Sequence, residues 1–437
     1  MISPDLLILG GSAALSAGML LRWRHLDGKH QRTTTNHAAG VPVALGPAAS
    51  IVTDSAQLAL MWPALGLGSW QSGYPNVTAA DLTESGMLVE VQMLGGQALK
   101  DWNNDATRDA LAHYFAVPDI EVSSPAPGFV HLHLRTTDTL AAPAPVTDLL
   151  AYGVDLEAVP VGVTEDHDVW RLRVLYGHIL LAGAMGSGKG SVLWSLLNGV
   201  GPAIKAGLVD VWLADPKGGA EFGRGENKLF VRFAVDSRSI LTMLGEAVTA
   251  MQDRLSRMRA AGIRKLVPST DEPLILIVID EAASLSAYAD REEQNEFRRL
   301  TGLLLSQGRA AGVSVIAALQ DPSKETMPNR QLFPIRIGLR LDEPTQTAMV
   351  HGQGARDRGA RCDEISEHTP GVGYVGEDGT TGFTRVRAFW VSDDDADRIV
   401  DTYSPAVPDL APKADYSGFD PDDLGDLGDD EQGPVAA

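Results

Sequence analysis

The chain has 437 residues, 44% of them apolar, with a formal net charge of −21 and one cysteine, Cys362. This length allows two or three domains with a substantial core. A single cysteine excludes a disulfide within the chain, and the acidic balance alone gives no indication of a nucleic-acid partner, since phosphate contacts require Lys and Arg.

The amino terminus has the composition of a membrane anchor. Leu6 to Leu21 contains no charge and is followed by Trp23 and several basic residues. As a helix this run would span about 24 Å, a little less than a roughly 30 Å hydrocarbon core. Because the positive charge follows the run, the pattern favours a single-pass anchor in the cell membrane, with the body in the cytoplasm, over a cleaved signal peptide. The alternative is a buried or amphiphilic amino-terminal helix. We predict an anchor and basic flank at 1–29 and a Gly/Pro-rich linker at 30–46.

Residues 47–150 are predicted to form a small α+β domain. Asp109 to Phe115 has a helical pattern, and Gly128 to Arg135 alternates like a half-exposed strand. His131 and His133 share one side of that strand, a spacing that a metal could use. No third ligand is evident nearby, so a polar sheet face is the favoured interpretation.

Residues 179–195 predict a phosphate-binding loop. An apolar strand leads into glycines that allow unusual turns, so that backbone N–H groups can point at a triphosphate, and Lys189 can reach the outer phosphates. The helix that starts there adds its positive end. The predicted nucleotide-binding residues are Gly183, Ala184, Met185, Gly186, Ser187, Gly188, Lys189, Gly190 and Ser191.

One position departs from the usual loop. Where Ser or Thr normally holds magnesium the chain has Gly190, and the hydroxyl follows one residue later at Ser191. A shift of one residue rotates a side chain by roughly 100° around a helix. Ser191 therefore either reaches the metal through water or does not reach it.

Leu274 to Ile279 is a continuous apolar run that ends in Asp280 and Glu281. Such a run is typical of a strand buried on both faces of a parallel sheet, whose carboxyl edge binds ligands. Asp280 would hold Mg²⁺ directly or through water, and Glu281 would polarise the attacking water. Adenylate-kinase-like enzymes also carry Gly after the loop lysine, but a kinase needs no hydrolytic glutamate, so the acidic pair favours an ATPase.

A second apolar run, Val313 to Leu319, ends in Gln320. A glutamine at a strand end beside the γ-phosphate could sense whether that phosphate is present.

Four features in order resemble the FtsK/SpoIIIE family of DNA-pumping ATPases. They are the loop at 183–189, Asp215-Pro216-Lys217 after a strand, the pair Asp280-Glu281, and Gly308 to Val313 leading to Gln320. An amphipathic helix at Ile240 to Met258 is also similar to the family. The resemblance covers about residues 150–395 and implies an α/β fold, a RecA-like P-loop ATPase whose parallel sheet is covered by helices, at 151–405. Within the family, the actinobacterial conjugation proteins of the TraB/TraSA type use the same Gly-Lys-Gly-Ser loop.

The resemblance also implies partners and cofactors. It implies a membrane-attached homo-oligomeric ring, usually a hexamer, that binds ATP and Mg²⁺ and threads double-stranded DNA. The ring would move plasmid or integrative-element DNA in conjugation or chromosome partition, with other conjugation proteins as further partners. A neighbouring subunit would then supply an arginine to each site, and Arg336 and Arg340 are the candidates. Surface or structural arginines are the alternative for both.

The charge is unevenly distributed along the chain. From Asp409 to the end there are nine acidic residues and one basic residue, which predicts a disordered acidic tail at 406–437. Arg309 to Arg361 carries a net +3, and Arg254 to Ser269 has five basic residues and no acidic one. No winged-helix module that reads DNA fits after the ATPase domain.

The alternative function is a protein-secretion ATPase of the type VII kind. Such motors usually have several ATPase domains on one chain, whereas this sequence has one intact loop.

Overall fold

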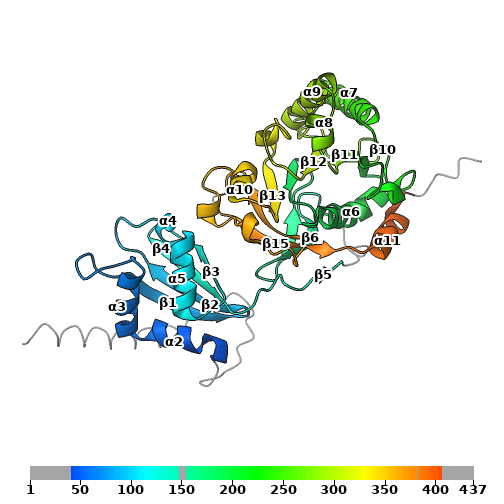
Figure 1. Ribbon diagram of the computed structural model, residues 1–437. Coiled ribbons are helices and arrows are strands. Elements are labelled where there is room, and N and C mark those ends of the chain that lie inside the picture. Colours follow the sequence, from blue (N-terminus) through cyan, green and yellow to red (C-terminus); the bar gives the residue numbers. More distant parts are fainter. Residues whose placement is uncertain (1–40, 147–153, 381, 406–437) are drawn as a thin grey trace, which may run out of the picture.

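The computed structural model describes residues 41–146, 154–380 and 382–405, which form a small amino-terminal unit beside a larger one (Figure 1). The predicted anchor at 1–29, most of the predicted linker and the acidic tail at 406–437 lie outside the described residues. Within the described part of the chain, no single helix has both the length and the apolar composition to cross a membrane. One pair of helices, Val43–Thr53 and Ser55–Ala64, meets both criteria together but is bent by 91°.

The small unit is a four-stranded antiparallel sheet in the order β1-β2-β4-β3, covered by helices. Its elements are η1 (Val43–Leu45), α2 (Gly46–Thr53), α3 (Ser55–Ala64), β1 (Asn76–Thr83), β2 (Gly86–Gln92), α4 (Leu99–Trp102), α5 (Asp105–Phe115), β3 (Asp119–Ser123) and β4 (Phe129–Arg135). The first element starts within the predicted linker, because Leu45 is buried in the core of this unit.

The expected helix and strand of this region are α5 and β4. The two histidines of β4 contact polar neighbours in the sheet, His131 at 3.4 Å from Glu90 and His133 at 3.3 Å from Ser123. They are therefore accounted for by the polar face of the sheet.

The large unit is built on one sheet in the order β10-β9-β11-β12-β8-β13-β14-β15-β6-β7, with β5 paired to β15. Its strands are β5 (Ala144–Pro145), β6 (Val159–Thr164), β7 (Val169–Leu172), β8 (Ile179–Ala182), β9 (Val209–Ala214), β10 (Arg232–Ala234), β11 (Leu274–Ile279), β12 (Val313–Leu319), β13 (Ile335–Leu339), β14 (Val372–Glu377) and β15 (Thr384–Trp390). The part from β10 to β13 is parallel, whereas β14, β15, β6 and β7 pair antiparallel. The sheet is thus mostly parallel, as predicted, and an antiparallel extension was not foreseen.

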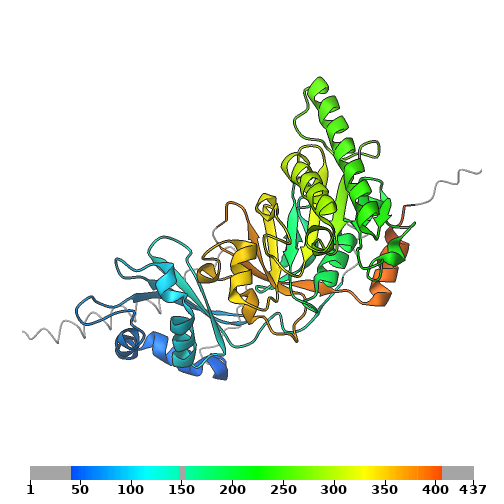
Figure 2. The same cartoon turned by 45° about the horizontal axis from the view of Figure 1, so that its top comes forward.

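Helices cover both faces of this sheet (Figures 1 and 2). On one face lie α6 (Lys189–Lys205) and α11 (Asp393–Tyr403); on the other lie α7 (Ser237–Ala261) and α9 (Arg291–Gln307), with α8 (Ala283–Ser286) and α10 (Pro344–His351). Short 3-10 turns complete the unit: η2 (Gly223–Gly225), η3 (Arg330–Leu332), η4 (Arg356–Arg358) and η5 (Cys362–Glu364). The central strands are buried on both sides, and this explains their unbroken apolar sequences.

An ion cluster joins the two units. Arg356 and Arg361 of the large unit both bind the Asp105 carboxylate at the start of α5, and Arg361 also donates to the Asn103 carbonyl at 2.8 Å. The Arg361 side chain is only 3% exposed, so its charge depends on these partners. The small unit is therefore docked on the segment that follows α10.

A second group of ions reaches across the same boundary. Glu165, in the turn after β6, lies 2.8 Å from Arg135 of the small unit and 2.8 Å from Arg385 of β15. Buried carboxylates need such partners, because an unpaired charge is costly in the interior. The two units thus share two groups of charged contacts.

Candidate functional site

The glycine-rich loop lies at the carboxyl end of β8, which pairs in parallel with β12 on one side and with β13 on the other. Gly186 and Gly188 have φ values of 71° and 98°, a region that favours glycine. A Cβ on Gly188 would also lie 2.3 Å from the backbone N of Gly371, in the loop before β14. Backbone conformation and the packed neighbour both require glycine here, and α6 starts at the next residue.

The loop lysine is folded onto its own loop. Lys189 is buried, and its Nζ donates to the carbonyls of Gly183 at 2.6 Å and Ala184 at 3.1 Å. Burial lowers the pKa of Lys189 to about 8. Phosphate oxygens that enter the loop would replace these carbonyls as acceptors. The Ser187 hydroxyl, 2% exposed, has no hydrogen-bond partner within the described residues.

The lowered pKa predicts a pH dependence of nucleotide binding. Only protonated Lys189 attracts phosphate, so affinity should be highest below pH 8 and fall as the pH rises through that value. Between pH 7 and 9 we expect the Kd of a fluorescent ATP analogue to rise by about tenfold, as one titrating group allows. Lys189→Arg should bind more weakly but with a flat profile, because guanidinium stays charged. If Kd changed with pH to the same extent in both proteins, Lys189 would not be the group that causes the pH dependence.

The acidic pair follows β11, two strands from β8. The Glu281 side chain is buried and accepts from the N–H of Ala283 through Oε1, while Oε2 has no partner among the described residues. Burial raises the pKa of Glu281 above its ordinary value. A carboxylate with a raised pKa and a free oxygen suits a general base that acts on water.

The segment after β9 contributes groups to which the sequence assigned no role. Lys217 Nζ lies 2.6 Å from Asp280 Oδ2, and although burial opposes its charge, this hydrogen bond raises the pKa of Lys217. Asp215 is fully buried and accepts from three backbone N–H groups of the segment, those of Lys217, Glu221 and Phe222. The motif Asp215-Pro216-Lys217 was the signal for this arrangement. Asp215 thus holds the backbone of this segment in a loop, and Lys217 of the loop contacts Asp280.

The donors present fit a magnesium ion that also binds phosphates. Asp280 stands near the loop lysine, and Mg²⁺ usually binds through one or two carboxylates plus substrate phosphates. No group of three or more His, Cys, Asp and Glu among the described residues could hold a metal. Ser191, the alternative hydroxyl, is partly exposed on the first turn of α6. A metal here would therefore depend on the nucleotide for part of its coordination.

Gln320 and the two arginines differ in their distance from the loop. Gln320 is exposed directly after β12, and the preceding Leu319 carbonyl accepts from Gly183 N at 3.1 Å. Arg340 donates to the Met185 carbonyl at 2.7 Å and so contacts the loop of its own chain. Arg336 lies near the other end of β13, roughly 13 Å earlier along the strand, and donates to the Phe333 carbonyl. The roles of all three residues stay predictions.

The basic segments are largely engaged within the chain. Arg254 is buried and donates to three backbone carbonyls, and Arg257 pairs with Glu272 at 2.5 Å. Arg361 binds Asp105 and Asn103 of the small unit. The net charges of these segments therefore overstate the positive surface that is available to DNA.

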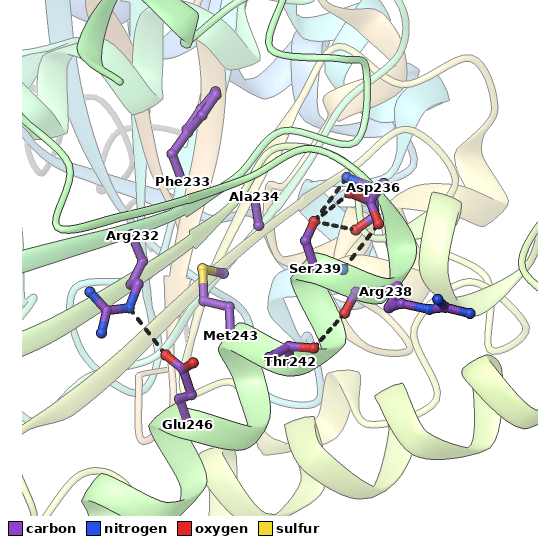
Figure 3. Close-up of a pocket in the computed structure, with 9 residues that line it drawn as sticks. All are labelled: Arg232, Phe233, Ala234, Asp236, Arg238, Ser239, Thr242, Met243 and Glu246. Atoms are coloured by element: carbon purple, nitrogen blue, oxygen red, sulfur yellow. Dashed lines mark hydrogen bonds and ion pairs between the residues drawn. The ribbon is translucent and has the colours of Figure 1, made fainter. Parts of the chain in front are cut away.

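An open pocket of about 440 Å³ lies at the edge of the sheet, between β10 and the start of α7 (Figure 3). Arg232 in this pocket pairs with Glu246 at 3.1 Å, and Asp236 caps α7 through Ser239. Strand β10 is four positions from β8 in the sheet. This pocket is therefore separate from the glycine-rich loop.

A glycine loop with a buried lysine, an Asp-Glu pair on a nearby strand of the same parallel sheet, and helices on both faces define a P-loop ATPase. Residues 152–271 match the FtsK/SpoIIIE family, and residues 48–136 match the actinomycete conjugal transfer protein N-terminal domain. The loop at 183–189 and the motif Asp215-Pro216-Lys217 both lie within the residues that are similar to the FtsK/SpoIIIE family, as the sequence indicates.

Two relatives illustrate this. Transfer protein TraSA of Streptomyces ambofaciens is 28% identical over 364 residues, which cover 78% of this chain and 85% of TraSA. DNA translocase FtsK of Streptococcus pyogenes serotype M3 is 25% identical over 353 residues, which cover 73% of this chain. The match spans only 41% of the length of that FtsK.

Two solved structures share the fold. The pCW3 conjugation coupling protein TcpA, in a monomer form with ATPγS, has a TM-score of 0.52 at 20% identity, covering 79% of this chain and 98% of TcpA. The cytoplasmic domain of the Thermomonospora curvata type VII secretion ATPase EccC has a TM-score of 0.50 at 22% identity, covering 61% of this chain and 35% of EccC. At these identities the likeness concerns the fold alone.

Proposed function

We propose that this protein is an ATP-driven translocase of double-stranded DNA that acts in conjugative transfer. The observation that carries the proposal is the match to a transfer protein across 78% of this chain and 85% of the relative, which includes both the small unit and the ATPase domain. The acidic pair beside the loop supports hydrolysis, in which the nucleophile is water.

The residues of the site have distinct roles in this proposal. The backbone N–H groups of the loop and Lys189 bind the phosphates of ATP. Asp280 holds Mg²⁺, which would neutralise charge that develops on the phosphates. Glu281 accepts the proton of the attacking water, and Gln320 responds to the presence of the γ-phosphate. The buried setting of Glu281 supports its role, since a raised pKa makes the carboxylate a stronger base.

We further propose a homo-oligomeric ring, a hexamer, attached to the membrane through residues 1–29. Arg340 contacts its own loop, which supports a role within its own subunit. Arg336 is then the remaining candidate to act on a neighbouring site. Its side chain is 22% exposed, and one guanidinium nitrogen lies 3.9 Å from the Asp378 carboxylate.

A type VII-like secretion ATPase is the second candidate, because EccC shares the fold. The sequence contains one intact phosphate loop and one acidic pair at strand ends, and the small unit matches a conjugal transfer domain. These features favour DNA over a protein substrate.

The test is the ATPase rate of the full-length protein in detergent, with and without linear double-stranded DNA, at two salt concentrations. We expect stimulation by the duplex that falls as salt rises, because counterion release makes phosphate contacts salt-dependent. Single-stranded DNA of equal length is the control. A flat response in an assembled ring would contradict DNA translocation and direct the search to protein substrates.

A further inference from the structure

The side chain of Glu221 occupies the space next to Gly190. A Cβ built on Gly190 would lie 2.4 Å from Oε1 and 3.2 Å from Cδ of Glu221. No residue with a side chain fits there unless Glu221 moves. The position that usually carries the magnesium-binding hydroxyl of a phosphate loop therefore faces a carboxylate from another segment.

Glu221 is held in this position from two sides. Its own N–H donates to the buried carboxylate of Asp215 at 3.2 Å. The next residue, Phe222, is fully buried and stacks on Trp194 of α6, with ring centroids 5.1 Å apart. Since α6 is the helix that starts at the loop lysine, the backbone that carries Glu221 is packed against the same element as the loop. Its side chain is nevertheless exposed and free to meet a ligand.

The surrounding charges point to a divalent cation. Burial and the Asp280 charge raise the pKa of Glu221, and burial and, more weakly, the same charge raise the pKa of Glu281, so both glutamates interact electrostatically with Asp280. Two lysines oppose them: Lys217 on Asp280 at 2.6 Å, and Lys189 on its loop carbonyls. Independently, Oε2 of the buried Glu281 has no hydrogen-bond partner among the described residues. A bound cation would stabilise negative charges that interact in this way.

We propose that Glu221 serves as a magnesium-binding residue of the nucleotide site, in place of the hydroxyl that is missing at Gly190. The proposal rests on the proposed ATPase function and specifies which group of the chain, besides Asp280, faces the metal. Lys217 then acts as the positioning residue that holds Asp280. A carboxylate also carries a full charge where a hydroxyl carries none, so metal affinity should depend strongly on it.

The experiment measures metal binding rather than turnover. Full-length protein in detergent is loaded with ATPγS and titrated with Mn²⁺, which is followed by electron paramagnetic resonance. Glu221→Ala should weaken Mn²⁺ binding by about tenfold or more, the usual effect of losing a group that tunes a metal site. Binding of a fluorescent ATP analogue in EDTA should be unchanged, which separates a metal defect from misfolding.

The double variant Gly190→Ser with Glu221→Ala decides the assignment. It restores the usual hydroxyl and removes the side chain that would collide with it, so Mn²⁺ affinity should recover most of the loss. The exposed Glu226→Ala is the matched control and should behave as wild type. Wild-type Mn²⁺ affinity in Glu221→Ala, or no recovery in the double variant, would overturn the proposal. Failure of nucleotide binding in the wild-type protein would instead overturn the ATPase function itself.

Discussion

Glu281→Gln should retain nucleotide and reduce ATP turnover by about 10²–10⁴-fold, the range for loss of a positioned general base. Glutamine keeps the volume of the side chain in a buried site, so the neighbouring contacts should survive. It cannot take a proton from water, because an amide is not a base at neutral pH. The measurement is the single-turnover rate of ATP hydrolysis, with the Kd of a fluorescent ATP analogue determined in parallel.

The control for this variant is Glu272→Gln. Glu272 lies outside the site and pairs with Arg257 on the surface, so its replacement should change neither quantity. Because the Oε2 atom of Glu281 makes no hydrogen bond within the described residues, the substitution breaks few existing interactions. Wild-type turnover in Glu281→Gln would show that another group activates the water.

Lys189→Ala should weaken nucleotide binding and remove turnover. The Nζ atom already sits among loop carbonyls, so alanine deletes the only side-chain charge that the loop itself offers to phosphates. A charge-assisted hydrogen bond contributes about 1.5–3 kcal/mol, which corresponds to a loss of about 10–100-fold in affinity. The turnover should fall further, since the charge on phosphate grows in the transition state. The measurements are a binding titration and the steady-state ATPase rate.

Lys205→Ala is the matched control for the loop lysine. Lys205 ends the same helix and donates to the Thr402 carbonyl at 2.9 Å, far from the loop. It tests whether loss of a lysine on α6 alone affects folding. Retained affinity in Lys189→Ala, with Lys205→Ala unchanged, would exclude a contribution of Lys189 to phosphate binding.

The strands of the parallel core were predictable because burial on both faces leaves a simple pattern. Leu274 to Ile279 was expected as a buried strand, and the structure gives β11 the same bounds. The helix expected at Ile240 to Met258 lies within α7, whose apolar residues follow the helical period. The local sequence is sufficient to predict such elements, because burial follows one regular pattern along the whole strand or helix.

The antiparallel extension was not predictable from composition. Strands β14, β15, β6 and β7 come from both ends of the ATPase domain, and β15 joins β6 through pairs such as Arg387 with Val163. Their partial exposure gives mixed sequences without a strong period. Pairing across more than 200 residues depends on the finished sheet.

The sequence by itself determined the loop, the acidic pair and the order of motifs, because each of these is a short run whose chemistry lies in adjacent residues. Only the tertiary structure decided that Glu221 faces Gly190 and that Lys217 binds Asp280. The parallel register of β9 and β11, which pairs Ala214 with Ile279, brings the residues after both strands to the same edge of the sheet. Contacts between segments that are distant in the chain follow from such register and packing, and no local pattern encodes them.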